Sequence, residues 1–220
     1  APETRQHACM SAGHAHSHGN ALTSERRLWI ALALTATFLV VEVAASLLTG
    51  SLALLSDAGH MATDVAALAI ALLAIKLGKR PADSRRSFGY RRLEILAAAL
   101  NAAGLFLVAG YVLIEAVQRF GNPRPVDSIG MLVVAAMGLI INAISMKLLS
   151  DGRDESLNVR GAYLEVWADF LGSIAVLLGA ALIWQTGRTW IDPLVAILIA
   201  LWVLPRGWQL LTSASHVLLE

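Results

Sequence analysis

The spacing of the 17 Lys and Arg residues constrains this chain more than any other feature, because it leaves long intervals without a basic side chain. These intervals cover residues 28–75, 93–118, 125–146, 161–187 and 189–205. A helix needs about 20 largely apolar residues to cross a bilayer, and each interval is close to or above that length. The first is long enough for two crossings, with a turn at Thr49, Gly50 and Ser51 between them. We therefore expect six membrane-spanning helices.

The composition supports a membrane protein, since 57% of the residues are hydrophobic and only 15% are charged. Six spans use roughly 130 to 140 residues, which leaves little for a water-soluble domain. The fold class expected is therefore an all-α bundle of six transmembrane helices. The expected spans are residues 28–48, 52–75, 93–117, 129–149, 161–184 and 190–211.

The distribution of basic residues predicts the orientation of the bundle. With the N-terminus inside, 14 basic residues fall on the cytoplasmic side and three, Arg119, Arg124 and Arg188, on the other. Basic residues favour the cytoplasmic side of membrane proteins. We therefore expect both termini in the cytoplasm. The basic residues follow membrane boundaries, without a basic face interleaved with aromatics, so nucleic-acid binding is not expected.

Residues 1–24 are expected to form a flexible cytoplasmic tail. Its side chains able to bind metals are His7, Cys9, His14, His16 and His18. Cys and His at short spacing suit zinc-like ions, so the tail is interpreted as a metal collector, with an inert tail as the alternative. Cys9 is the only cysteine, which excludes an intramolecular disulfide.

Two pairs of ionisable residues lie inside expected spans, where each costs about 2.5–3.5 kcal/mol on insertion scales. His60 and Asp64 are four residues apart, and so are Glu165 and Asp169, so each pair shares one helix face. Counted from the span boundaries, all four lie at a similar depth. One imidazole and three carboxylates are a suitable set of ligands for a tetrahedral divalent metal such as zinc. The alternatives are interhelical hydrogen bonding and a proton relay.

Other polar residues in the spans have less specific interpretations. Asp57 lies one helical turn before His60, where it is expected either to orient the imidazole or to serve the structure. Hydrogen bonding between helices is the main role expected for Glu42, Asn101, Glu115 and Asn142.

Three ordered segments resemble signatures of the cation diffusion facilitator family, and most of all its bacterial cobalt–zinc–cadmium resistance exporters. They are GSLALLSDAGHMATD at residues 50–64, FGYRRLEILAA at 88–98 and NVRGAYLEVWAD at 158–169. The likeness runs over residues 25–220. It implies export of divalent metal ions from the cytoplasm by proton antiport, from a homodimer in a bacterial inner membrane. Carried over by position, the transport ligands of the family are His60, Asp64, Glu165 and Asp169.

The sequence departs from the family pattern at Glu165, where many zinc exporters have a histidine. A third carboxylate makes the site harder and more negative, so Cd²⁺ and Co²⁺ are expected substrates beside Zn²⁺. Most members also continue into a soluble metal-binding domain, whereas this chain ends at Glu220. The expected organisation is therefore the tail, residues 1–24, and a six-helix transport domain, residues 25–220, without that C-terminal domain.

The expected mechanism exchanges metal for protons by alternating access. Three carboxylates and a neutral imidazole carry three negative charges, which an empty site of low dielectric reduces by taking up protons. Metal and protons then compete for the same groups. The alternatives are a membrane metal-binding receptor and a divalent-cation channel without proton coupling. An enzyme is not expected, because no His-Glu-x-x-His motif is present and four ligands leave no open position for water. The metal is cargo, and no cofactor is expected.

Overall fold

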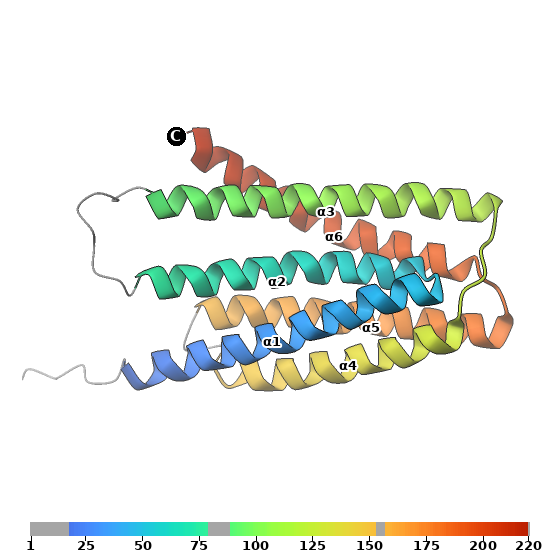
Figure 1. Cartoon of the computed structure of the whole chain (residues 1–220), viewed down its shortest axis with the longest axis horizontal. Helices are drawn as coiled ribbons and strands as arrows, with labels where there is room; N and C mark the ends of the chain where they lie inside the picture. Colours follow the sequence, from blue (N-terminus) through green and yellow to red (C-terminus); the bar gives the residue numbers. More distant parts are fainter. Residues whose placement is uncertain (1–17, 79–88, 153–156, 220) are drawn as a thin grey trace, which may run out of the picture.

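The computed structural model describes residues 18–78, 89–152 and 157–219, and the regular secondary structure in these ranges is entirely α-helical (Figure 1). The elements are α1 (His18–Thr49), α2 (Leu52–Gly78), α3 (Gly89–Gly121), α4 (Ser128–Ser150), α5 (Leu157–Thr186) and α6 (Ile191–Leu219). The described residues thus confirm the prediction of an all-α, six-helix fold. Each helix contains almost all of the span predicted for it and most extend beyond it by several residues.

Successive helices run in opposite directions, so the connections gather at two ends of the bundle (Figure 1). The turn end holds residues 50–51, 122–127 and 187–190, and the loop end holds the last residues of α2 and α4 and the first residues of α3 and α5. The start of α1 and the end of α6 also lie toward the loop end. Gly50 has a φ of 68°, a left-handed conformation that glycine adopts without a Cβ penalty. The predicted turn at Thr49–Ser51 is therefore confirmed.

Among the residues that the structure describes, five helices are long and apolar enough to cross a membrane, and α2 is not one of these five. The first half of α2 carries three ionisable side chains, Asp57, His60 and Asp64. Packing explains why α2 tolerates them, because it contacts α1, α3, α5 and α6. The polar side chains of α2 therefore face other helices and are buried. This burial matches the rule that ionisable residues in membrane helices face the bundle interior.

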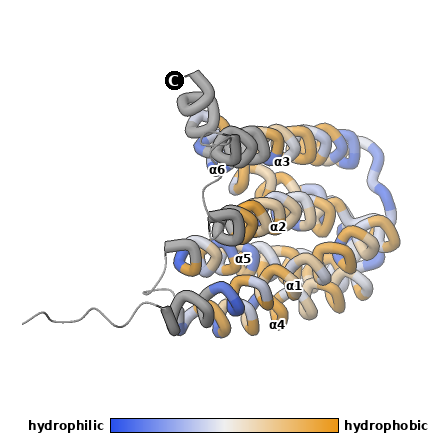
Figure 2. Tube along the Cα trace, turned by 60° about the vertical axis from the view of Figure 1, so that its left-hand side comes forward, coloured by the Kyte–Doolittle hydropathy of each residue, from blue (hydrophilic) through white to orange (hydrophobic). Residues whose placement is uncertain are grey.

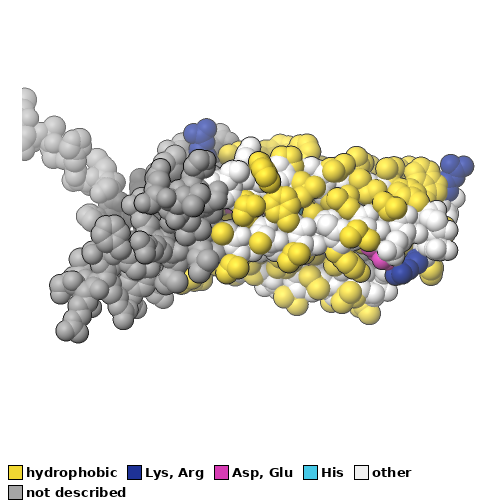
Figure 3. Space-filling model, turned by 90° about the horizontal axis from the view of Figure 1, so that it is seen from above, with side chains coloured by type: hydrophobic (Ala, Val, Ile, Leu, Met, Phe, Trp, Pro, Cys, Tyr) yellow, Lys and Arg dark blue, Asp and Glu magenta, His cyan; other side chains and the backbone are white. Residues whose placement is uncertain are grey.

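The outer surface is apolar. Large hydrophobic side chains such as Leu48, Leu107 and Val117 are exposed on the outside of the bundle. On the face drawn in Figure 3, hydrophobic side chains cover the described surface, and Lys and Arg appear toward its ends. Hydrophobic residues follow the helices, whereas the connection between α3 and α4 is hydrophilic (Figure 2). An exposed apolar band between charged ends is the surface that a lipid bilayer covers.

Two apolar clusters hold the helices together. The larger cluster, toward the turn end, includes Leu54, Val112, Met131, Val176 and Ala196. The smaller cluster, toward the loop end, consists of Leu28, Ala31, Leu68, Leu72, Leu149, Val159, Ala162 and Val166. His60 and Asp64 lie on α2 between residues of the two clusters. The polar residues of α2 are thus enclosed between well-packed apolar layers.

Asp192 fixes the start of α2 at the turn end. Its carboxylate is fully buried and accepts hydrogen bonds from the backbone N–H groups of Leu52 at 2.7 Å and Ala53 at 3.1 Å. The Ser51 hydroxyl donates to the same carboxylate at 2.6 Å. These contacts satisfy N–H groups that a helix leaves unpaired in its first turn. Arg119 of α3 lies 3.4 Å from Asp192, so three helices meet at this carboxylate.

The predicted tail ligands cannot be placed. His7, Cys9, His14 and His16 lie outside the described residues, and of His18 only the backbone, at the start of α1, is described. Residues 18–24 of the predicted tail form the first turns of α1. The flexible tail before them and the metal-collecting role of residues 1–24 stay predictions.

Candidate metal centre

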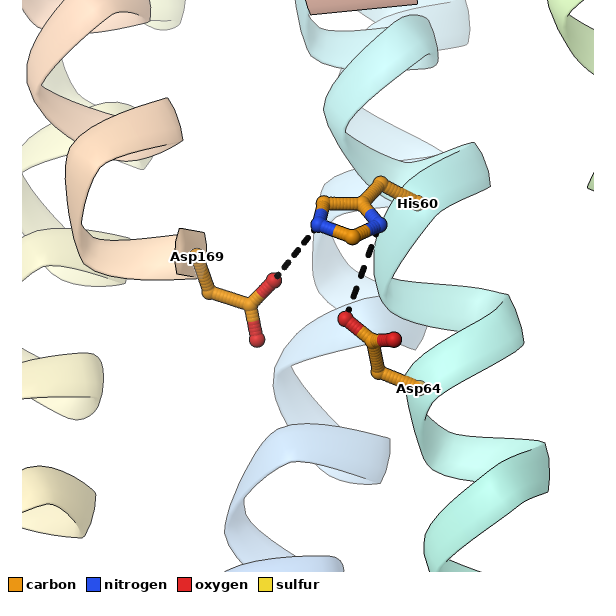
Figure 4. A group of neighbouring side chains, drawn as sticks. All are labelled: His60, Asp64 and Asp169. Carbon is orange, nitrogen blue, oxygen red and sulfur yellow. Dashed lines mark ion pairs between the residues drawn. The ribbon is translucent and has the colours of Figure 1, made fainter. Parts of the chain in front are cut away.

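Helices α2 and α5 bring three of the four predicted ligands together (Figure 4). The His60 imidazole lies between two carboxylates, with Nδ1 3.5 Å from Asp64 Oδ2 and Nε2 3.9 Å from Asp169 Oδ1. One potential ligand atom from each residue lies within 4.8 Å of the other two. The one-turn spacing on α2 places His60 and Asp64 on the same face, and α5 supplies Asp169 from the opposite side.

The three side chains are buried, and the atoms that they turn toward one another lack hydrogen-bond partners among the described residues. His60, Asp64 and Asp169 are 4%, 9% and 3% exposed. In the part of the chain that the structure describes, neither imidazole nitrogen has a hydrogen-bond partner, and neither do Asp64 Oδ2 and Asp169 Oδ1. A buried polar atom without a partner costs about 1–3 kcal/mol, so such atoms need an explanation. A cation held among them supplies one, because it would satisfy the lone pairs that no protein donor reaches.

The distances suit a small divalent cation better than direct hydrogen bonds. Both His60 contacts are longer than ordinary hydrogen bonds, which join donor and acceptor at about 2.7–3.2 Å. Ligands bound at about 2.1 Å to a tetrahedral zinc ion lie about 3.4 Å from one another. The observed separations need only small side-chain shifts to reach that value. One imidazole nitrogen would coordinate such an ion together with the two carboxylates.

Glu165, the fourth predicted ligand, lies outside this three-residue group. Arg206 of α6 donates from Nη2 to Glu165 Oε1 at 2.7 Å and lies 3.5 Å from Asp64 Oδ1. Arg206 therefore bridges the two carboxylates from the loop-end side. Side-chain exposures of 23% for Glu165 and 33% for Arg206 show that this pair is more open than the other three residues. In this structure the Glu165 carboxylate has a guanidinium as its partner.

The sequence did not predict the contact of Arg206 with the site. In the sequence, Arg206 is one of the 14 basic residues that fall on the expected cytoplasmic side. The neighbouring residues carried a weak signal. Pro205 lies inside α6 and lacks the N–H that would continue the helical hydrogen bonding. Gly207 is buried, and a Cβ there would lie 2.9 Å from Leu105 Cδ2 of α3. A proline and a tightly packed glycine on either side of an arginine indicate a fixed backbone more than a free boundary charge.

Asp57 lies against α5 and makes no hydrogen bond with His60 in the described part of the chain. It is buried, and a Cβ on Gly172 of α5 would lie 2.5 Å from Asp57 Oδ1. Glu42 of α1 faces the same carboxyl group. The expectation that Asp57 orients the imidazole thus receives no support from a hydrogen bond, since both His60 nitrogens lack a partner.

A cavity of about 210 Å³ adjoins the site on its turn-end side. Asp57 and His60 supply its polar lining. Its other lining residues come from α5 and α6 and are Ala168, Leu171, Gly172, Ala175, Leu198, Ile199, Trp202 and Val203. The centre therefore has a cavity on one side and Arg206 on the other.

Two asparagines support the helices that carry the site. Asn101 Nδ2 of α3 donates to the Thr63 carbonyl, next to Asp64, at 2.9 Å. Asn142 Nδ2 of α4 donates to Ser173 Oγ, one turn after Asp169, at 3.1 Å. Both bonds join different helices, as predicted. Glu115 differs, because in the described residues its ion pairs are with Arg119 of the same helix and Arg124 of the following connection.

Comparison with known families agrees with this architecture. Residues 28–219 match the family described as the cation efflux transmembrane domain. The chain belongs to this family, the cation diffusion facilitators, as the three sequence segments predicted. The match includes all of α2. The family consists of cation efflux proteins, not of enzymes.

Several curated relatives share most of this chain. The metal cation efflux system protein CzcD of Cupriavidus metallidurans is 59% identical over 211 residues, which are 96% of this chain and 66% of that protein. The zinc transporter ZitB of Escherichia coli is 45% identical over 212 residues, 94% of this chain and 68% of that protein. A cadmium, cobalt and zinc/H⁺–K⁺ antiporter of Bacillus subtilis is 40% identical over 210 residues, 94% of this chain and 67% of that protein. The chain thus spans about two thirds of the length of these relatives.

Proposed function

We propose that this protein exports Zn²⁺, and with it Cd²⁺ and Co²⁺, from the cytoplasm in exchange for protons. The transport ligands would be His60, Asp64, Glu165 and Asp169. The observation that carries this proposal is the buried His60–Asp64–Asp169 group, whose facing nitrogen and oxygen atoms have no hydrogen-bond partners among the described residues. Two of these residues lie on α2, which packs against four other helices of a bundle with an apolar outer surface. Such a position suits a substrate that crosses the membrane.

The donor set favours these metals. Imidazole nitrogen suits zinc and other late transition metals, whereas magnesium and calcium prefer oxygen ligands alone. The names of the relatives point the same way, since one is called a zinc transporter and another a cadmium, cobalt and zinc antiporter. Glu165 adds a third carboxylate near the site, which supports a range of metals wider than zinc.

Proton coupling follows from the chemistry of the ligands. A metal binds the deprotonated carboxylates and the neutral imidazole, so metal and protons compete for the same atoms. A site that opens to the cytoplasm would release protons and bind metal. The same site, opened to a more acidic exterior, would be protonated and lose the metal. Alternating access would then convert a proton gradient into metal export.

The proposal includes an orientation and an assembly. We infer that the loop end faces the cytoplasm, because the connection 79–88 carries four basic residues, whereas the turn end carries Arg119, Arg124 and Arg188. We also propose that the protein works as a homodimer in a bacterial inner membrane, as the resemblance to the family implies. Residues 1–24 would form the cytoplasmic metal-collecting tail of a transport domain that covers residues 25–220.

Flux into proteoliposomes tests this function. Cd²⁺ or Zn²⁺ uptake by the purified protein should saturate with metal concentration and should rise when a pH gradient drives proton counterflow. Asp64→Ala should abolish the uptake, because it removes a carboxylate from the buried group. Asp151→Asn, which alters an exposed acid at the loop end, serves as the matched control and should transport normally.

The alternatives give different results in the same assay. Flux that stays linear with concentration and is equal with and without a pH gradient would indicate a channel. Saturable metal binding without flux would indicate a receptor. Either result contradicts the proposal, and so does an Asp64→Ala variant that transports as fast as the wild type.

A further inference from the structure

We propose that Arg206 is a built-in counter-cation of the transport site, which holds Glu165 away from the metal position and closes the site on its loop-end side until a metal ion displaces it. This inference rests on the proposed function, because it concerns the same site. Its basis is a geometry that the sequence did not indicate. One guanidinium nitrogen lies 2.7 Å from Glu165 Oε1 and 3.5 Å from Asp64 Oδ1.

Arg206 offsets part of the negative charge of the site. Asp64, Glu165 and Asp169 place three carboxylates near one another in a part of the bundle with little exposure to water. Buried charges are tolerated only when they are paired and hydrogen-bonded. Arginine keeps its charge under all physiological conditions, so Arg206 offsets one carboxylate without any proton. With this residue in place, the metal-free site carries two formal negative charges instead of three.

Arg206 and a bound metal ion would compete for the same carboxylate oxygens, those of Glu165 and Asp64. Glu165 Oε1 either accepts a hydrogen bond from the guanidinium or coordinates a metal ion, and in the described structure it accepts from Arg206 Nη2. Asp64 is shared in a different way, because Oδ1 faces Arg206 while Oδ2 faces His60. A metal ion that binds Asp64 and draws in Glu165 must therefore displace Arg206. The arginine thus raises the concentration at which metal fills the site.

Arg206 also lies on one of the two sides from which an ion could approach the site. Arg206 belongs to α6, whereas Glu165 belongs to α5 and Asp64 to α2, so one side chain ties three helices together. It lies on the loop-end side of His60 and Asp169, and the cavity lined by Asp57 and His60 lies on the turn-end side. In this structure the ion pairs of Arg206 therefore lie on the loop-end side of the site, while open space remains on the opposite side. Release of Arg206 would remove the ion pairs that join α6 to α5 and α2, whereas the apolar contacts among these helices would remain.

The residues on either side of Arg206, Pro205 and Gly207, restrict the position of the α6 backbone. Pro205 interrupts the hydrogen bonding of α6, and Figure 1 shows the end of α6 leaving the direction of the bundle. Gly207 permits close packing of α6 on Leu105 of α3. Adjacent residues of a helix point in directions about 100° apart, so Gly207 can contact α3 while Arg206 reaches α5 and α2.

Metal binding and transport by Arg206→Gln test the proposal. The purified variant should bind Cd²⁺ at least about tenfold more tightly than the wild type at pH 8, because the competing cation is gone. In proteoliposomes its KM should fall together with kcat, since no internal cation helps to expel the metal. Arg206→Lys should restore most of the wild-type behaviour, because it keeps the positive charge.

Two further variants separate this role from a general effect on folding or surface charge. Arg160→Gln removes an exposed basic residue near the loop end and should leave affinity and KM unchanged. In a Glu165→Gln background, the added change Arg206→Gln should alter the affinity much less, because the main partner of the arginine is already gone. A structural role would instead give the same effect in both backgrounds and a lower affinity.

The outcome that overturns the proposal is an Arg206→Gln protein that is folded and binds Cd²⁺ with unchanged or weaker affinity. An equal response of Arg160→Gln overturns it as well. Failure of the proposed function has a different signature, because the wild type itself would then show no saturable, proton-coupled transport of Cd²⁺, whatever its affinity for the metal.

Discussion

His60 is the residue on which the candidate site is organised, because each of its ring nitrogens faces a carboxylate from a different helix. Its position follows from two simple facts, the one-turn spacing to Asp64 and the packing of α5 against α2. Asp169 completes the group from α5, whereas Glu165, one turn earlier, is turned toward Arg206. The same i,i+4 spacing on α5 thus leads to two different environments.

Glu165→His tests whether the third carboxylate widens the range of metals. A second imidazole would favour zinc, and it would also lose the ion pair with Arg206. We therefore expect the ratio of the Cd²⁺ to the Zn²⁺ dissociation constant to rise several-fold in competition binding. Glu165→Gln, which removes the charge without adding an imidazole, is the control. An unchanged ratio in the histidine variant would refute a role of Glu165 in selectivity.

At the scale of whole elements, α2 is the central helix, held at its start by Asp192 and in its middle by contacts with α5. Its contact with α5 is close at Gly172, where only a hydrogen atom separates the backbone from Asp57 Oδ1. The spacing of these two helices sets the distance between His60 and Asp169. Small residues that allow close helix approach are common in membrane bundles.

Gly172→Ala should therefore weaken metal binding without touching a ligand. The added Cβ would lie 2.5 Å from Oδ1 of the buried Asp57, so this carboxylate must turn aside or α5 must move away from α2, and either shift disturbs the packing that sets the distance between His60 and Asp169. We expect a loss of about tenfold in Cd²⁺ affinity, which isothermal titration of the purified protein would measure. Gly104→Ala is the matched control, because a Cβ at that position meets no atom within 4 Å. Equal affinities of the two variants would contradict the account of this contact.

The element-level predictions from the sequence succeeded where the signal is local. Gaps between basic residues placed all six helices, and Gly50 marked the turn before α2. Local spacing also pointed to four candidate ligands, of which the structure brings His60, Asp64 and Asp169 together. It could not show that Asp192 caps α2, since those residues are about 140 positions apart in the chain.

At the scale of the whole molecule, the site separates two different surroundings, with Arg206 toward the loop end and a cavity toward the turn end. Linear spacing did not predict this asymmetry, because it depends on how α6 leans against α3, α5 and α2. A basic residue near a helix end looks the same in the sequence whether it meets lipid headgroups or a buried carboxylate. In the structure, the packing of α6 on α3, α2 and α5 places Arg206 beside the carboxylates of Asp64 and Glu165.

The central claim, that the buried group on α2 and α5 is the transport site, is tested most directly by locating the metal. Anomalous scattering from crystals of the Cd²⁺-loaded protein would show where the ion lies. We expect one strong anomalous peak among His60, Asp64 and Asp169, and we expect this peak to be absent from crystals of the Asp64→Ala variant. A transport-competent protein whose only peaks lie elsewhere, with these three residues unoccupied, would contradict it.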